Sequence, residues 1–297
     1  MRRSVALFAL CLSAAFAQPA KKLKVHISVD MEGVAGVVST DQLAPGSFEY
    51  ERFRGFMTRE ANAAVSGAIA AGATEIVVVD SHGNGENLLI EAFPPEHVRL
   101  IRGFPRHLGM MAGIDSTFDA AIFIGYHAST SNSRGVRAHT FSSAQLTRVA
   151  LNGTEVTEGA WNAAIAGHFG VPVVFASGDD AAIEEIRKGI GPIDAFVTKR
   201  TLSFHAADSV MPQASVAGIE AGVQAALGHL STFKPYRVNG PVTVEISFKH
   251  YRPVELLAYL KRFERPNSHT IRFTAQDMVE ASDLETFITS YQIGLEP

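Results

Sequence analysis

The sequence predicts an α/β fold, with a mostly parallel, doubly wound sheet, helices on both faces and a smaller C-terminal α+β unit. Two observations carry this prediction. Short continuous apolar runs, which are typical of strands buried on both faces, recur along the chain. Helical patterns separate these runs, and such alternation implies parallel strands joined by crossover helices.

The first half of the chain supplies four of these elements. A strand is expected at residues 24–29, where polar and β-branched apolar residues alternate. Residues 50–71 have the apolar spacing of a helix, and Gly72 follows them as a stop signal. Continuous apolar runs at residues 75–79 and 120–124 predict two buried strands.

A hairpin and a second alternating series follow. Asn152-Gly153 lies between two short β-prone segments, residues 147–151 and 155–156, and this pair accepts the positive φ angles of a type I′ turn. The other elements expected before residue 231 are a helix at 158–168, a strand at 171–176, a helix at 180–188, a strand at 195–198 and a long helix at 210–230.

Phe233-Lys234-Pro235 marks a boundary between two units. Beyond it, the pattern predicts a strand at 242–248, a helix at 253–263, a strand at 270–274 and a closing helix at 278–291.

The N-terminus has the features of a secretory signal peptide. Arg2 and Arg3 precede an uncharged, mostly apolar stretch, and Ala15-Phe16-Ala17 fits a small-x-small cleavage site. We therefore expect export, to the periplasm or the medium, after cleavage near Ala17. A frayed apolar helix is the alternative. Nothing else in the chain is apolar over a length that spans a bilayer, so no stable membrane anchor is expected. The expected organisation is residues 1–17 as signal peptide, 18–234 as the α/β domain and 235–297 as the α+β subdomain.

The amino-acid composition excludes several classes of protein and of metal site. The chain has 297 residues, of which 46% are apolar, and this excludes a disordered protein. Its 26 basic residues against 30 acidic ones argue against a nucleic-acid partner. Cys11 is the only cysteine, so a disulfide framework or a thiolate zinc site within one chain is impossible. Any metal site must use histidine and carboxylate ligands.

Polar residues follow the predicted buried strands at the points where those strands end. Asp30 and Glu32 follow the first strand and, being two residues apart, point to the same face of an extended chain. His82 and His127 follow the next two strands, and Glu158 begins a helix. Active sites of open α/β sheets lie beyond the carboxyl ends of the strands. We therefore expect these five side chains to meet, the alternative being separate polar strand ends.

This ligand set favours a metal centre. Two imidazoles and three carboxylates without sulfur suit zinc, manganese, cobalt or iron. A single catalytic metal usually takes three protein ligands, whereas five ligands with one bridging carboxylate suit two metals. The set is Asp30, Glu32, His82, His127 and Glu158.

Five segments in one order resemble peptidase family M55, the D-aminopeptidases. They are Ser28-Val29-Asp30-Met31-Glu32-Gly33, Asp80-Ser81-His82, Gly125-Tyr126-His127-Ala128 with the later His139, Glu158-Gly159-Ala160-Trp161-Asn162-Ala163, and Val171-Pro172-Val173 with Gly178-Asp179-Asp180. The similarity runs from about Lys24 to the last helix.

The resemblance implies a two-zinc aminopeptidase that acts on short peptides with a preference for D-amino acids. It assigns the metal ligands to Asp30, as the bridge, with Glu32, His82, His127 and Glu158, and it marks His139 as catalytic. It leaves open whether His139 acts as nucleophile, acid or oxyanion stabiliser. It also implies a ring-shaped homo-oligomer of pentamers, which stack as a decamer.

Two rival functions share this ligand set. A different metal-dependent amidase or esterase would use the same residues on another exported substrate. An exported metal- or peptide-binding protein would bind without turnover. A serine hydrolase and a dinucleotide enzyme fit poorly, because their glycine-rich motifs are absent from the sequence.

Overall fold

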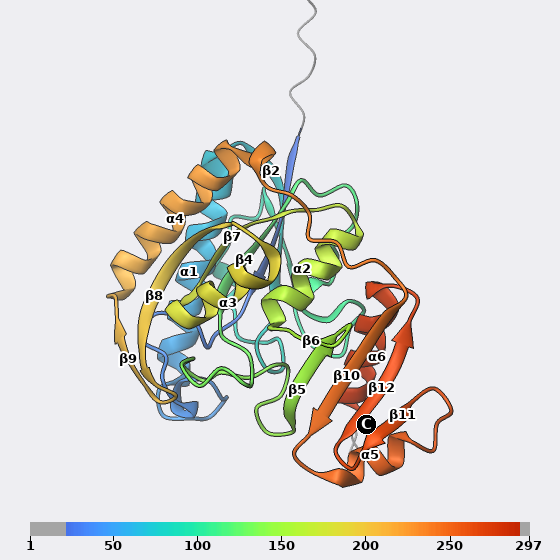
Figure 1. Ribbon diagram of the computed structural model, residues 1–297. Coiled ribbons are helices and arrows are strands. Elements are labelled where there is room, and N and C mark those ends of the chain that lie inside the picture. The colour runs from blue at the N-terminus through green and yellow to red at the C-terminus, as the bar shows by residue number, and fades with distance from the viewer. Residues whose placement is uncertain (1–21, 292–297) are drawn as a thin grey trace, which may run out of the picture.

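The computed structural model describes residues 22–291, and its centre is a seven-stranded sheet (Figure 1). The strand order is β3-β2-β1-β4-β7-β8-β9, and every neighbouring pair is parallel except β8 with β9. The strands are β1 (Leu23–Val29), β2 (Ala73–Asp80), β3 (Val98–Ile101), β4 (Ala120–Tyr126), β7 (Val173–Asp179), β8 (Asp194–Ser203) and β9 (Ala206–Ser209). The mostly parallel α/β fold is thus confirmed.

Helices cover both faces of this sheet. One face packs on α1 (Tyr50–Ala70) and α4 (Pro212–Gly228), which share an apolar core with β1. The other packs on α2 (Glu158–His168) and α3 (Asp180–Ile190). Residues of β2 alternate between the two cores, with Ile76 and Val78 in one and Val77 and Val79 in the other. This alternation explains the continuous apolar run, because each face of the strand is buried.

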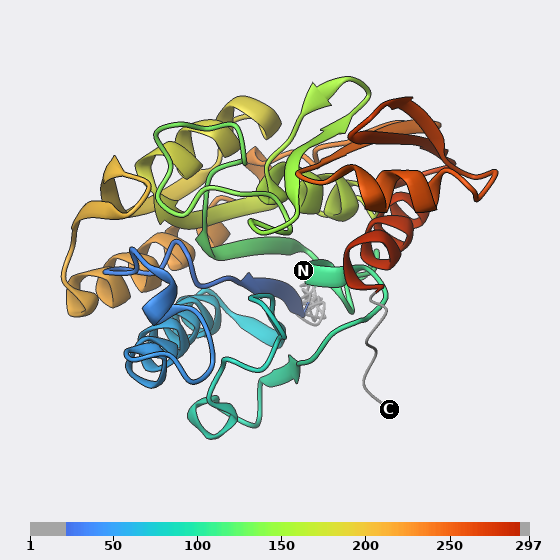
Figure 2. The same ribbon diagram turned by 90° about the horizontal axis from the view of Figure 1, so that it is seen from below.

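A second, antiparallel sheet lies beside the first (Figure 2), in the order β11-β12-β10-β5-β6. Its strands are β5 (Leu146–Leu151), β6 (Thr154–Glu155), β10 (Val242–Phe248), β11 (Glu264–Asn267) and β12 (Thr270–Ala275). Helices α5 (Tyr251–Leu257) and α6 (Met278–Ser290) accompany it, and α6 also packs on α2. Val244 and Phe273 of this sheet share one apolar core with Phe123 of the main sheet.

The hairpin forms as expected, with positive φ angles of 49° at Asn152 and 82° at Gly153. Its strand β5 pairs with β10 rather than with the main sheet, so the second sheet combines residues from both sides of residue 234. The division of the chain at residue 234 stays a prediction. The expected signal peptide lies outside the described residues. Within residues 22–291 no helix combines the length and the apolar character needed to span a membrane.

Four short features differ from the expected elements. Strands β3, β9 and β11 were not expected, because they have four residues each and are half-buried or exposed, without a marked apolar pattern. Helix α5 ends at Leu257, six residues before the expected end, and the chain continues in turns before β11.

Two glycines allow the ends of β1 and β4 to meet. The Gly33 amide donates to the Gly125 carbonyl over 2.7 Å. A Cβ atom on Gly33 would lie 2.1 Å from the Tyr126 carbonyl oxygen, and one on Gly125, whose φ is +72°, would lie 2.2 Å from the Asp30 carbonyl oxygen. No larger residue fits either place, so these glycines set the approach of the two segments that carry Asp30 and His127.

Candidate metal centre and active site

Asp30 and Glu32 follow β1 and are both buried, with exposed fractions of 2% and 5%. The Asp30 amide continues the sheet by donating to the Ile124 carbonyl over 2.7 Å. The Asp30 side chain accepts from the Met31 amide through Oδ1 at 2.8 Å. Both carboxylates contact His82, although the chain between them is a bend and turn rather than the extended segment that the sequence suggests.

His82 follows β2 and points one ring nitrogen at these carboxylates. Its Nδ1 lies 3.0 Å from Glu32 Oε2 and 3.4 Å from Asp30 Oδ1. Its Nε2 lies 2.8 Å from the Leu43 carbonyl oxygen, which can only accept, so Nε2 carries a proton. In the neutral ring the Nδ1 lone pair then faces the carboxylates, which is how a partner behind the ring orients a metal-binding histidine.

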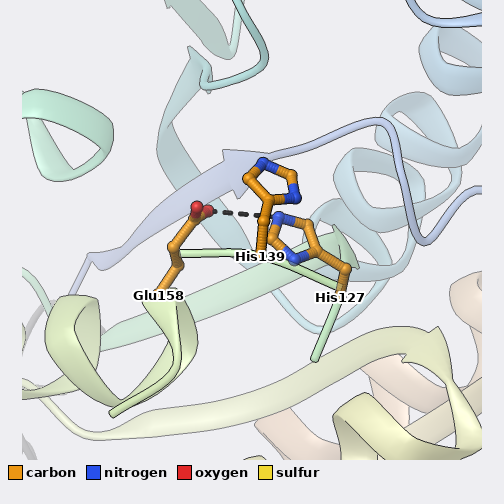
Figure 3. A group of neighbouring side chains, drawn as sticks. All are labelled: His127, His139 and Glu158. Atoms are coloured by element: carbon orange, nitrogen blue, oxygen red, sulfur yellow. Dashed lines mark ion pairs between the residues drawn. The ribbon is translucent and has the colours of Figure 1, made fainter. Parts of the chain in front are cut away.

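His127 follows β4 and makes the same arrangement with the opposite ring atoms (Figure 3). Its Nε2 lies 3.2 Å from Asp30 Oδ2 and 3.4 Å from Glu158 Oε2. Its Nδ1 donates to the Ala128 carbonyl over 3.0 Å. Glu158 begins α2, where Thr157 caps the helix by accepting from the Ala160 amide. Glu158 Oε1 accepts from the Phe141 amide at 2.6 Å, and the other oxygen, Oε2, faces His127.

The ligand atoms form two groups, each gathered within 4.8 Å, and Asp30 belongs to one group and contacts the other. One group is Asp30, Glu32 and His82, and the other is His127, His139 and Glu158. Asp30 turns Oδ1 to His82 and Oδ2 to His127, and Oδ2 is buried without a hydrogen-bond partner among the described residues. A buried carboxylate oxygen is favourable only beside a positive charge, which a bound cation or a protonated His127 at 3.2 Å supplies. The residues thus fit a two-metal centre with oxygen and nitrogen ligands.

His139 lies against His127, with ring centroids 4.0 Å apart and planes 9° from parallel (Figure 3). Its Nδ1 donates to the Arg137 carbonyl over 2.8 Å, so in the neutral ring the Nδ1 atom carries the proton and Nε2 has a lone pair. Arg137 and Phe141, two residues to either side, have φ angles of 54° and 61°. Such positive φ angles are costly for these residues, and strain of this kind is common beside functional groups.

Without metal, the charges of the site compensate one another. Burial opposes the charged imidazole, but Glu32 and Asp30 raise the pKa of His82 well above its ordinary value. Glu158 and Asp30 do the same for the pKa of His127. Burial opposes the ionised form of Glu32, yet His82 lowers the pKa of Glu32 well below its usual range. Metal ions would replace these imidazole protons, since metal-bound histidine is neutral.

The pKa of His139 behaves differently, because burial and the neighbouring His127 lower it. A histidine with a lowered pKa is neutral near pH 7, so it can accept a proton and return it. This property separates His139 from His82 and His127, whose nearest partners are carboxylates.

A cavity of about 420 Å³ opens onto the centre. Its wall includes Phe104, Met110 and Trp161, the 142–145 segment, and Ser282, Glu285, Thr286 and Thr289 of α6. No lysine or arginine among the described residues lines it. The cavity is therefore an acidic, partly apolar space with room for a small molecule.

Two buried residues near the site were not singled out from the sequence. Lys199 of β8 is 1% exposed and donates through Nζ to the carbonyl oxygens of Glu32, Val34 at 2.9 Å and Val37 at 2.8 Å. It thereby holds the backbone that carries Glu32. Lys199 stands next to Arg200 in a strand of mixed composition, so the local sequence gives no signal for this role. Glu285 lies in the cavity wall, and one acidic residue on an amphipathic helix gives no such signal.

All six residues expected in the site, Asp30, Glu32, His82, His127, His139 and Glu158, thus lie together. A carboxylate–imidazole centre beyond the strand ends of a doubly wound sheet is the arrangement of a metal-dependent hydrolase. The chain belongs to the D-aminopeptidases of peptidase family M55, whose model matches residues 23–286.

Two comparisons agree with this membership. A D-aminopeptidase of Bacillus subtilis (strain 168) is 33% identical over 260 residues, which cover 87% of this chain and 94% of that protein. The structure of the zinc-dependent D-aminopeptidase DppA from Bacillus subtilis, described as a self-compartmentalizing protease, superposes with a TM-score of 0.87. That match has 32% identity and covers 93% of this chain and all of the other.

Proposed function

We propose that this protein is a two-zinc aminopeptidase that hydrolyses the N-terminal peptide bond of short peptides, with preference for a D-amino acid. The observation that carries this proposal is that Asp30 belongs to one group of ligand atoms and contacts the other, and that both groups open onto one cavity. Family membership and the zinc dependence of DppA support the choice of metal and reaction.

The residues divide between two ions. Glu32 and His82 would hold one ion, His127 and Glu158 the other, and Asp30 would bridge them through its two oxygens. Zinc held in this way supplies Lewis acidity, which lowers the pKa of water and polarises a carbonyl group.

His139 provides the proton transfer in this proposal. Its Nδ1 proton is fixed by the Arg137 carbonyl, so Nε2 is the atom that exchanges a proton. A neutral His139 would take a proton at Nε2 from the water that attacks the scissile carbonyl carbon, and it would deliver that proton to the amine as the C–N bond breaks. The stacked ring of His127 restricts the motion of His139, so Nε2 stays beside the centre.

Metal analysis with matched D- and L-alanyl dipeptides tests the proposal. Two zinc ions per chain and faster hydrolysis of the D-alanyl substrate are expected. Hydrolysis of esters or amides but not of peptides would favour another metal-dependent amidase or esterase. Metal and peptide binding without turnover would indicate a binding protein.

We further propose export of the chain after cleavage near Ala17, and assembly into pentameric rings that stack as a decamer. The sequence of residues 1–17 supports export. The description of DppA as self-compartmentalizing supports assembly. Intact mass of the protein from its host and native mass spectrometry of the purified protein check the two points.

A further inference from the structure

One wall of the cavity is formed by helix α6, which packs on the second sheet, whereas the metal ligands lie on the main sheet and α2. Ser282, Glu285, Thr286 and Thr289 recur at helical spacing and line the cavity together. The helix packs on α2, the element that begins with Glu158. One face of α6 is therefore turned toward the site.

Glu285 is the one carboxyl group of this wall. It is 6% exposed, and it is absent from both groups of ligand atoms, so the metal centre does not need it. The Thr289 hydroxyl lies 2.9 Å from Glu285 Oε1 and 3.0 Å from the Glu285 carbonyl oxygen, and it has only one proton to share between them. Thr286 is a second hydroxyl partner of the carboxyl group, so Glu285 has hydrogen-bond donors beside it but no lysine or arginine of the cavity wall.

A buried carboxylate without a cation is unfavourable, and the cavity offers no lysine or arginine among the described residues. Burial, with a further contribution from the charge of Glu158, raises the pKa of Glu285 to about 8 despite the hydrogen bonds with Thr289 and Thr286. A positively charged group brought in by a ligand would compensate this carboxylate directly.

We propose that Glu285 is a specificity-determining residue that pairs with a side-chain ammonium group of the substrate, so that the enzyme favours short peptides containing a basic residue. This inference rests on the proposed function. The α-amine of the substrate is two bonds from the scissile carbonyl and must stay with it at the metal centre. Glu285 lies outside the groups of metal ligands, so the α-amine cannot be its partner there. An amine at the end of a long, flexible side chain can extend from the metal centre to Glu285.

Two matched pairs of dipeptides test the proposal with the zinc-loaded enzyme. One pair carries D-lysine or D-norleucine at the first position, and the other carries them at the second. Norleucine has the length of lysine without the amine. The wild type should favour the lysyl member of at least one pair by about tenfold or more in kcat/KM. Glu285→Gln should bring this ratio close to one, mainly by raising KM for the lysyl substrate.

Asp283→Asn is the matched control, because Asp283 is exposed on the same helix, pairs with His107 and does not line the cavity. It should keep the lysyl preference. The proposal is overturned if the wild type prefers neither lysyl substrate, or if Glu285→Gln keeps the preference. In either case Glu285 is a structural partner of Thr289.

A binding measurement separates this proposal from the function on which it rests. Calorimetry compares D-lysine with D-norleucine binding to the zinc-loaded protein and to Glu285→Gln. If no dipeptide is hydrolysed, the proposed peptidase activity fails, and the calorimetry alone decides the role of Glu285. Tighter D-lysine binding that is lost in Glu285→Gln supports the pairing, and equal binding of both amino acids refutes it.

Discussion

At the scale of single residues, the site depends on which atom of each side chain is already engaged. The Leu43 carbonyl accepts a hydrogen bond from His82, and the Ala128 carbonyl accepts one from His127. The Phe141 amide donates a hydrogen bond to one oxygen of Glu158. The remaining atoms, His82 Nδ1, His127 Nε2 and Glu158 Oε2, face the centre. The protein backbone thus selects the ligand atoms before any metal arrives.

Asp30 and His82 should differ in what their removal costs. Asp30→Ala should lose both metals because its two oxygens serve both groups, whereas His82→Ala removes a ligand of one ion and should retain close to one metal per chain. Both variants should lose nearly all activity. Elemental analysis after gel filtration measures the metal content, and two metals retained in Asp30→Ala would contradict the bridging role.

His139→Ala should keep both metals and lower kcat by about 10²–10⁴-fold, with little change in substrate affinity, because a proton-transfer group acts mainly in the transition state. His250→Ala, an exposed histidine, is the control and should stay near wild type. His139 is grouped with His127 and Glu158 within liganding distance. Loss of metal from His139→Ala would therefore make it a ligand.

At the scale of elements, the sequence is most informative where both faces of an element are buried. Strands β1, β2, β4 and β7 and helix α2 lie close to where continuous apolar runs and helical spacing place them. Strands β3, β9 and β11 lie at sheet edges, where their residues are half-buried or exposed and no apolar pattern is required. Local patterns also cannot assign the β5–β6 hairpin to a sheet, because its partner β10 is about 95 residues away.

The same distinction applies to the site. Asp30, His82 and His127 follow buried strands, so the topology alone brings them together. Lys199 and Glu285 reach the site only through tertiary packing. Lys199 contacts backbone atoms about 165 residues away, and Glu285 depends on how α6 is rotated against α2. Neither relation leaves a local pattern in the sequence.

Glu60 should make stability depend on pH, because it joins α1 to two other segments. Its Oε1 accepts from the Ala35 amide at 3.0 Å and the Ser215 hydroxyl at 2.7 Å, while Oε2 is buried and has no hydrogen-bond partner within residues 22–291. Burial raises the pKa of Glu60 to about 7, against the opposing effects of these hydrogen bonds and of the positive charge of Lys199. The folded state then holds the proton more tightly than the unfolded state does.

The free energy of unfolding should accordingly fall as pH rises from about 4.5 through about 7, by on the order of 3 kcal/mol from this group. Glu60→Gln keeps an acceptor at Oε1 and does not titrate, so its stability should change less over the same range. Urea unfolding of metal-free protein at several pH values measures both. An equal slope in wild type and variant would exclude Glu60 as the source.

At the scale of the whole molecule, the metal centre joins segments that are distant in the chain. Its residues come from the ends of β1, β2 and β4 and from the start of α2, across about 130 residues. Binding to the folded state alone should therefore stabilise all of these segments together.

Zinc at a thousandfold excess over its dissociation constant contributes about 4 kcal/mol per ion. For a chain of this size, removing it should lower Tm by roughly 10 °C or more. Calorimetric scans with and without a chelator measure the difference. Asp30→Ala should show almost no such difference, and a chelator effect of the same size in that variant would place the stabilising metal elsewhere.

The contribution of α6 to the cavity separates two properties that enzymes often combine. The ligands that set the reaction lie on the main sheet and α2, whereas the wall with Glu285 comes from a helix of the second sheet. Substitutions on one face of α6 can change which peptides are accepted without touching a metal ligand. After a gene duplication, the two copies can therefore diverge in substrate preference and keep the same reaction, and the differences would lie on the helix that packs on the second sheet.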